Sequence, residues 1–223
     1  AFGDAFARVQ FGDEFVTTIR PSAVDPNIKW EETTSWNVGL DYGFLDGRVT
    51  GTLDYYVKDT DDLLFRVPVA AGTAVSNAIT TNVGSIRNRG VEFGIDVDVL
   101  PADRPGLRWA ANFNAAYNRN EITRINPFGG GGERILVGEI AGGVGSTIQV
   151  LQPGSPVNSF FVYRHRRDAD GRPVNAANDI DMYVDQNGDG IINQNDRVAH
   201  ESPSPDWILG HTSRLGWRDF DLS

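Results

Sequence analysis

The sequence lacks cysteine, is poor in basic residues and has no long apolar run. Without cysteine, the chain can form neither a disulfide framework, nor a thiolate zinc site, nor a cysteine nucleophile. Its 20 Lys+Arg stand against 30 Asp+Glu, and this net charge of −10 disfavours nucleic acid as a partner. No stretch reaches the ~18 consecutive apolar residues of a membrane-spanning helix. A membrane β-barrel is not excluded, because its strands alternate apolar and polar residues.

Five segments alternate apolar and polar residues with a period of two, which is typical of β-strands. In the first, Trp36, Leu40 and Phe44 share one parity, and polar residues such as Asp41 fill the other. Every stripe is long enough to cross a bilayer as a tilted strand, which takes ~9–11 residues. Aromatic residues lie toward the stripe ends, as in the girdles of membrane barrels. The five apolar stripes run over 36–44, 49–57, 91–99, 107–117 and 207–217, and residues 11–19 form a weaker strand.

The connections between the stripes alternate between short and long. Residues 45–48, 100–106 and 218–219 form short joints, whereas 58–90 and 118–206 form long loops. Outer-membrane barrels have short periplasmic turns on one rim and long extracellular loops on the other. The sequence therefore predicts an all-β fold in which residues 1–223 are a fragment of a large antiparallel transmembrane β-barrel with long extracellular loops.

Polar residues occupy the parity opposite to the apolar stripes. If the stripes face lipid, these side chains point into the barrel lumen, where they could line a channel or contact a plug. The chain starts at Ala1 and stops at Ser223, one turn into a further strand, so we expect an excised piece of a larger barrel. The predicted lumen-facing residues are Asp41, Asp54, Glu92, Asp96, Asp98, Asn112 and Asn114.

Residues 185–196, within the long 118–206 loop, have the order of a calcium-binding loop. Oxygen-bearing side chains occupy loop positions 1, 3, 5, 9 and 12, glycine occupies position 6, and a backbone carbonyl is available at position 7. Ca²⁺ prefers six or more oxygen ligands around such a tight turn. The alternative is an Asn/Gly/Asp-rich turn that needs no ion. The predicted structural Ca²⁺ ligands are Asp185, Asn187, Asp189, the Ile191 carbonyl, Asn193 and Asp196.

Nothing in the sequence indicates an enzyme. His165, His200 and His211 lack metal-ligand spacing to one another, and the glycine run 129–132 lacks the Gly-Lys-Ser/Thr that follows in a phosphate-binding loop. We therefore expect no catalytic residues and no organic cofactor.

Several segments, in order, resemble the TonB-linked outer membrane proteins of the SusC/RagA type, a branch of the TonB-dependent receptors. The resemblance covers residues 25–223 and includes the Asp25–Glu31 segment, Asn82-Val83-Gly84 and Pro203–Trp207. It implies that the chain is the C-terminal part of the barrel. It implies an outer-membrane importer for a glycan or other oligomeric solute, partnered by a SusD-type surface lipoprotein and by TonB. The plug and the TonB-contact segment are not in this sequence.

A soluble alternative gives a different expectation for the same apolar residues. A secreted or surface-attached β-sandwich with a structural calcium, acting as a binding or adhesion module, would bury them in its own core. A barrel would leave them as a lipid-facing band. The residues that distinguish the two are Trp36, Leu40, Val91, Phe93 and Trp109.

Overall fold

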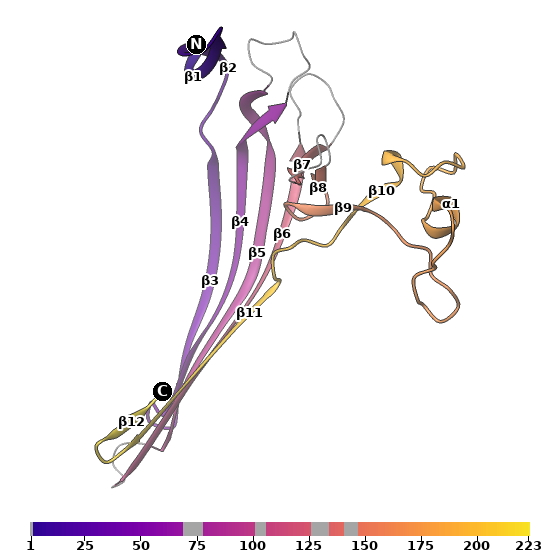
Figure 1. Cartoon of the computed structure of the whole chain (residues 1–223). Coiled ribbons are helices and arrows are strands. Elements are labelled where there is room, and N and C mark those ends of the chain that lie inside the picture. Colours follow the sequence, from indigo (N-terminus) through magenta and orange to yellow (C-terminus); the bar gives the residue numbers. More distant parts are fainter. Residues whose placement is uncertain (1, 69–77, 101–105, 126–133, 141–146) are drawn as a thin grey trace. The chain divides into compact units, whose positions relative to one another are not determined.

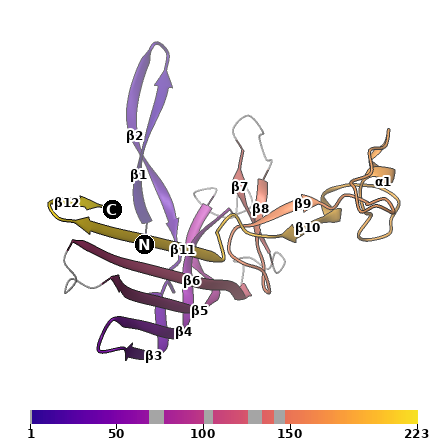
Figure 2. The same ribbon diagram turned by 90° about the horizontal axis from the view of Figure 1, so that it is seen from below.

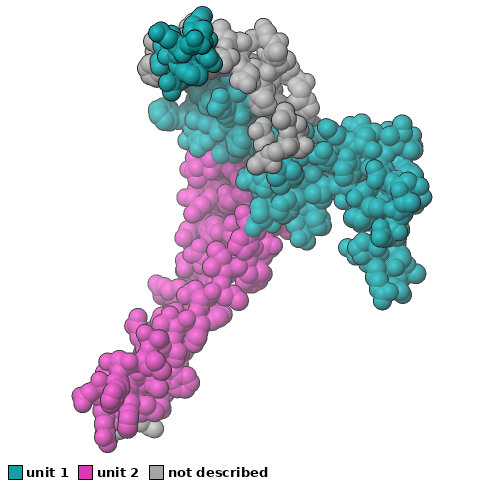
Figure 3. All heavy atoms as spheres, viewed as in Figure 1, with its two compact units in different colours: residues 1–31, 62–85, 121–203 teal, residues 32–61, 86–120, 204–223 magenta. Residues whose placement is uncertain are grey.

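The structure, a computed structural model, describes residues 2–68, 78–100, 106–125, 134–140 and 147–223. The chain divides into two compact units, which Figure 3 colours separately. Unit 1 contains residues 1–31, 62–85 and 121–203, and unit 2 contains residues 32–61, 86–120 and 204–223.

Unit 2 is built on long neighbouring strands that follow one another in sequence order (Figure 1). Viewed from below, in Figure 2, the strands succeed one another in that order across the sheet. The pairs β3–β4, β6–β11 and β11–β12 are antiparallel, as predicted. These strands are β3 (Glu32–Phe44), β4 (Val49–Pro68), β5 (Ala78–Leu100), β6 (Leu107–Ile125), β11 (Trp207–Trp217) and β12 (Phe220–Leu222).

The short joints of unit 2 have local causes in the sequence. Between β3 and β4, the successive residues Leu45, Asp46 and Gly47 all have positive φ, which Asp and Gly tolerate better than most residues. The guanidinium of Arg48 then donates to the carbonyl oxygens of Asp98 and Val99, 3.1 Å away in each case, at the end of β5. This contact fixes the turn against the neighbouring strand. A two-residue turn between Trp217 and Phe220 joins β11 to β12, as predicted.

The predicted long loop 58–90 is wrong over most of its length. Strand β4 continues from residue 58 to Pro68, and β5 begins at Ala78, so only residues 69–77, outside the described residues, separate them. The apolar alternation ends at Val57, but strand pairing continues beyond it because ladder hydrogen bonds do not require an apolar face. Likewise, β6 extends to Ile125, well into the predicted loop 118–206.

Unit 1 contains the buried core and a second sheet. The pair β1 (Phe2–Phe11) and β2 (Glu14–Val24) is a hairpin that turns at Gly12-Asp13. The strand predicted over residues 11–19 is therefore confirmed for residues 14–19 and wrong at the turn. A four-stranded sheet with the order β10-β9-β8-β7 occupies part of the predicted loop 118–206. Its strands are β7 (Ile135–Glu139), β8 (Thr147–Leu151), β9 (Ser159–Tyr163) and β10 (Arg197–His200). The core cluster is Val67, Val83, Ile122, Ile135 and Leu151.

Helix is scarce in the described residues. The α-helix α1 (Asp179–Met182) has a single turn, and a 3₁₀ turn spans Gln194–Asp196. No helix in the described part of the chain has the length and apolar content needed to cross a membrane.

Candidate functional site

One face of the unit 2 sheet carries a band of exposed apolar side chains. Trp36 is 74% exposed, Leu40 is 60% exposed and Leu209 is 64% exposed. These residues share a face because side chains alternate along a strand and Leu40 lies opposite Leu53 in the β3–β4 register. We call this the outward face. Of the residues that a β-sandwich would bury, Trp36, Leu40, Val91 and Trp109 are exposed and Phe93 is partly exposed, which does not favour the soluble alternative.

Aromatic side chains gather at both ends of the outward face. At the end of the sheet where β3 begins, which we call the Trp36 end, the rings of Tyr117 and Trp207 lie 4.9 Å apart. At the opposite end, the rings of Trp217 and Phe220 are stacked at 6.3 Å. Amphipathic aromatic rings favour the two membrane–water interfaces. This arrangement is the one expected of a strand sheet that crosses a bilayer.

The opposite face, which we call the polar face, carries the side chains that were predicted to point into the lumen. The Nδ2 of Asn112 donates to Asp96 Oδ1 over 3.0 Å, and Asn114 donates to Asn112 over 3.4 Å. Near the β3–β4 turn, this face has a hollow with a volume of about 300 Å³. The hollow is lined by both signs of charge, because Arg48 and Arg214 line it together with Asp96 and Asp98. A mixed-charge wall of this kind suits contact with water or with another polar protein surface.

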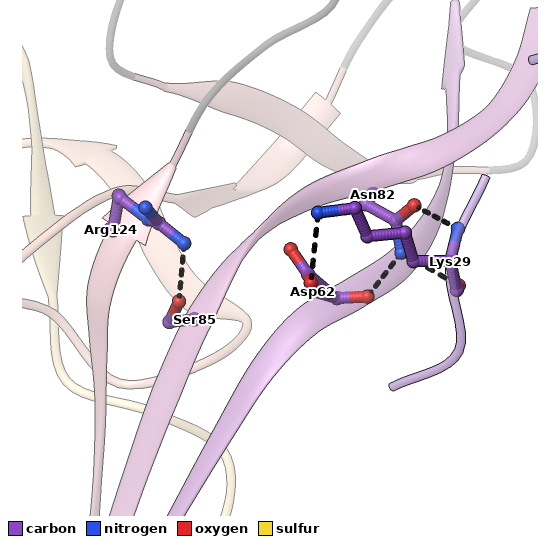
Figure 4. Close-up of polar contacts among 5 residues, drawn as sticks. All are labelled: Lys29, Asp62, Asn82, Ser85 and Arg124. Carbon is purple, nitrogen blue, oxygen red and sulfur yellow. Dashed lines mark hydrogen bonds and ion pairs between the residues drawn. The ribbon is translucent and has the colours of Figure 1, made fainter. Parts of the chain in front are cut away.

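In unit 1, Asn82 joins three chain segments (Figure 4). Its side chain accepts the backbone N–H of Lys29 over 2.7 Å and donates to the backbone carbonyl of Lys29 over 3.0 Å. It also donates to the carbonyl oxygen of Asp62, and the ammonium of Lys29 lies 4.0 Å from the carboxylate of Asp62. The Asn82-Val83-Gly84 segment noted in the sequence is therefore a structural clasp, a role that sequence reasoning did not assign.

Two further contacts strengthen this region of unit 1. Asp25 accepts a hydrogen bond from the Thr81 hydroxyl over 2.5 Å and another from the Asn27 N–H over 2.8 Å. Both bonds lower the pKa of the Asp25 carboxyl, and the bond from Thr81 has the larger effect. Arg124 donates to Ser85 over 3.2 Å (Figure 4). At Gly84, any side chain would run into the backbone carbonyl of Arg124, so only glycine allows the two strands to approach this closely.

The 185–196 segment forms a compact loop held by its own side chains. The carboxylate of Asp185 accepts the backbone N–H groups of Gly188 over 2.7 Å and Gly190 over 2.8 Å. Asp189 accepts the N–H of Ile191 over 2.8 Å. Gly188 and Gly190 have φ near +74° and +80°, the left-handed region that favours glycine. Gly190, the glycine expected at loop position 6, thus has the backbone conformation that both a calcium-binding loop and an ion-free turn require.

Asp196 closes this loop. Its two carboxylate oxygens accept the backbone N–H groups of Gln186 and Asn193, each over 2.8 Å, and its side chain is fully covered. Hydrogen bonds from backbone N–H groups hold the pKa of the Asp196 carboxyl below its usual range, although burial opposes this shift. The N–H of Asn193 contributes most, and those of Gln186 and Asn187 contribute less. Asp196 therefore ties the first and last thirds of the loop together as a carboxylate.

The predicted calcium ligands lie within this one loop, but their oxygens mainly accept backbone N–H groups. Within the described ranges, no group of three or more His, Cys, Asp or Glu side chains is placed to hold a metal ion. Calcium binding at this loop stays a prediction.

Comparisons with known proteins agree with this geometry. The family described as "TonB dependent receptor-like, beta-barrel" matches residues 1–136. The chain is 37% identical over 219 residues to the TonB-dependent receptor SusC of Bacteroides thetaiotaomicron, a match that covers 98% of this chain and 21% of SusC. It is 31% identical over 221 residues to the TonB-dependent receptor P26 of Formosa agariphila, covering 93% of this chain and 21% of that receptor.

The solved structure of the RagAB peptide transporter is similar in fold, with a TM-score of 0.69 at 22% identity, over 98% of this chain and 23% of that one. The chain spans about a fifth of the length of the curated relatives it matches. The predicted resemblance to the SusC/RagA type and the predicted partial barrel are confirmed. With its outward apolar band, its aromatic ends and its match over residues 1–136, the chain belongs to the β-barrel family of TonB-dependent receptors, proteins of the outer membrane.

Proposed function

We propose that this chain forms part of the wall of an energy-coupled importer that carries a large oligomeric solute, a glycan or a peptide, across the outer membrane. The observation that supports the proposal most directly is the two-sided sheet of unit 2. Its outward face exposes Trp36, Leu40 and Leu209, whereas its polar face gathers Asp96 and Asn112. A sheet with one face for lipid and one for water suits a barrel around an aqueous or plugged lumen.

The partners in this proposal are a SusD-type surface lipoprotein and TonB. Similarity to SusC and to the RagAB peptide transporter supports both, and the names of those relatives suggest the solute class. The Trp36 end of unit 2 would lie on the extracellular side of the membrane. The longest connection between strands of this sheet, from the end of β6 at Ile125 to the start of β11 at Trp207, leaves the sheet at that end, and long loops of such barrels are extracellular. The proposal includes no catalytic step.

Uptake by cells tests this function. The gene would be deleted in its own bacterium, and accumulation of fluorescent oligosaccharides and oligopeptides of graded size would be measured. The deletion should abolish accumulation of one oligomer class and leave the corresponding monomer unchanged. A protonophore should abolish the same uptake in the parent strain, because TonB coupling draws on the proton gradient. Unchanged oligomer uptake in the deletion strain, across both classes, would refute an importer.

Calcium at residues 185–196 is a second, separate proposal. The order of oxygen-bearing residues supports it, as does the N–H of Gly190 at loop position 6, which bonds to the Asp185 carboxylate at position 1 and so curls the chain toward a common centre. The ion would act as a structural clip for the region between β9 and β10. Calorimetric titration of the calcium-free, full-length protein with CaCl₂ tests it, and a calorimetric trace without heat of binding would contradict it.

A further inference from the structure

Two arginines lie on the outward face just beyond the apolar band, at the Trp36 end of unit 2. Arg89 precedes Val91 by two residues on β5, and Arg119 follows Tyr117 by two residues on β6. Because side chains alternate along a strand, each arginine shares the outward face with its apolar neighbour. Both arginines are exposed. They therefore lie at the level where the lipid-facing band gives way to polar residues.

The register of the sheet makes these two arginines direct neighbours. On the polar face, Asn120 donates to Asn88 over 2.6 Å, and the hydrogen bond between β6 and β5 nearer the other end of the sheet fits the same register. That register places Arg89 opposite Arg119 on the outward face. Opposed residues in an antiparallel pair have Cβ atoms about 5 Å apart. Two positive charges at this spacing repel each other.

The next arginine along β5 shows how the sheet compensates such a charge elsewhere. Arg87 makes a two-pronged contact with Asp59 on β4, with Nε–Oδ1 and Nη2–Oδ2 distances of 2.6 and 3.2 Å. Arg89 and Arg119 differ, because among the described residues neither guanidinium has a carboxylate or hydrogen-bond partner. The register thus places two arginines side by side, and among the described residues no carboxylate lies within ion-pair distance of either one.

We propose that Arg89 and Arg119 together bind the phosphate groups of a phosphorylated glycolipid in the outer leaflet of the membrane. A guanidinium matches phosphate with two parallel hydrogen bonds, and two opposed guanidinium groups can bind one phosphate from both sides. The rings of Tyr117 and Trp207 beside them mark the headgroup level of the membrane, which favours a lipid over a soluble anion. The proposal rests on the proposed function in one respect, the extracellular orientation of the Trp36 end.

Lipid binding to the full-length protein, purified in detergent, tests this proposal. Native mass spectrometry would follow a titration with lipid A carrying its phosphates and, separately, with the same lipid after removal of the phosphates. The double variant Arg89→Gln/Arg119→Gln should bind the phosphorylated lipid about 30-fold more weakly than the unmodified protein. The control Arg108→Gln/Arg214→Gln removes the same charge from the polar face, where Arg108 faces Asp221, and should bind as the unmodified protein does.

Removal of the phosphates from the lipid should weaken its binding to the unmodified protein by a similar factor. Equal affinity of the double variant and the unmodified protein would overturn the proposal, as would equal affinity for the two lipids. Since neither readout involves a transported solute, a failure here is distinguishable from a failure of the uptake experiment.

Thermal unfolding separates lipid binding from a structural role. In phosphate-free detergent, Arg89→Gln should leave Tm unchanged or raise it, because it relieves the repulsion from Arg119. With phosphorylated lipid A present, the unmodified protein should gain more in Tm than the variant does. If Arg89→Gln lowers Tm equally with and without the lipid, the arginines stabilise the sheet itself, and the proposal is overturned.

Discussion

A charged residue placed on the outward face should cost far more stability than the same residue on the polar face. Leu40 is a suitable position, since it lies four residues from each end of the 36–44 stripe and is 60% exposed. At about 3.3 Å per residue and a tilt near 45°, it lies about 9 Å inside both interfaces of the bilayer. Leu40→Arg should therefore place the guanidinium near the midplane, at a cost of roughly 2–4 kcal/mol.

The matched control introduces the same side chain one strand away. Thr52, which lies opposite Asp41 on the polar face, is exposed, so Thr52→Arg adds the same charge without contact with lipid. We expect Thr52→Arg to cost far less than Leu40→Arg.

Guanidinium unfolding of the full-length protein, refolded into phosphatidylcholine vesicles, measures both values. A loss of 2–4 kcal/mol corresponds to a decrease of roughly 30- to 1,000-fold in the folding equilibrium constant, well above the error of the extrapolation. Equal losses for the two variants would refute the assignment of the outward face to lipid.

A cysteine at Asn178 should react with a membrane-impermeant reagent on intact cells and a cysteine at Asp46 should not, if the Trp36 end is extracellular; the reverse result would invert the topology. Asp189→Ala, or a chelator, should make the 185–196 loop protease-sensitive while the strands stay intact. An unchanged digestion pattern would mean that the loop is a turn that needs no ion. The pKa of Asp196 is lowered, so its contribution to loop stability is complete above its ordinary pKa and is lost as the pH falls through the lowered value. Limited proteolysis of the loop should therefore increase as the pH falls below the ordinary pKa of an aspartate. Gly84→Val should destabilise unit 1 by about 2–4 kcal/mol, since backbone must move to admit the side chain, and an unchanged Tm would contradict the close approach to β6.

The alternation of apolar and polar residues predicted a strand only where one face of that strand has to be apolar. Where strands meet lipid, alternation is required, and the stripes at 36–44 and 207–217 fall within β3 and β11. From Lys58 to Asp62 both faces of β4 are polar, so periodicity carries no signal over those residues. The strand persists through pairing such as that between Asp59 and Arg87, which depends on a partner distant in the sequence.

The shorter elements were missed for other physical reasons. The strands of the β7–β10 sheet have only four or five residues, too few to establish a period. The N-terminal hairpin was misread because Gly12-Asp13 was taken as strand interior, although such a pair is a turn signal. By contrast, the 185–196 turn was predictable because its side chains bond mainly to backbone within the same loop, as Asp185 does to Gly188.

Glycine inside the strands of unit 2 shows how a sheet without a core of its own is stabilised. Glycine weakens a strand because it has no side chain to pack. In this sheet, a large or polar side chain from the neighbouring strand covers each of several glycines. Tyr42, for example, lies over Gly51 and donates to the carbonyl oxygen of Gly94 over 3.3 Å, while Tyr56 lies over Gly90 and donates to Asn118 over 3.0 Å.

Such pairs add a side-chain contact across strands that the ladder hydrogen bonds alone do not provide. They work on both faces, since Tyr42 shares the outward face with Leu40, whereas Tyr56 shares the polar face with Asn118. A barrel wall one sheet thick cannot bury its side chains against a second layer of its own. Its side chains must therefore pack sideways, along the sheet, and glycine provides the space in which they do so.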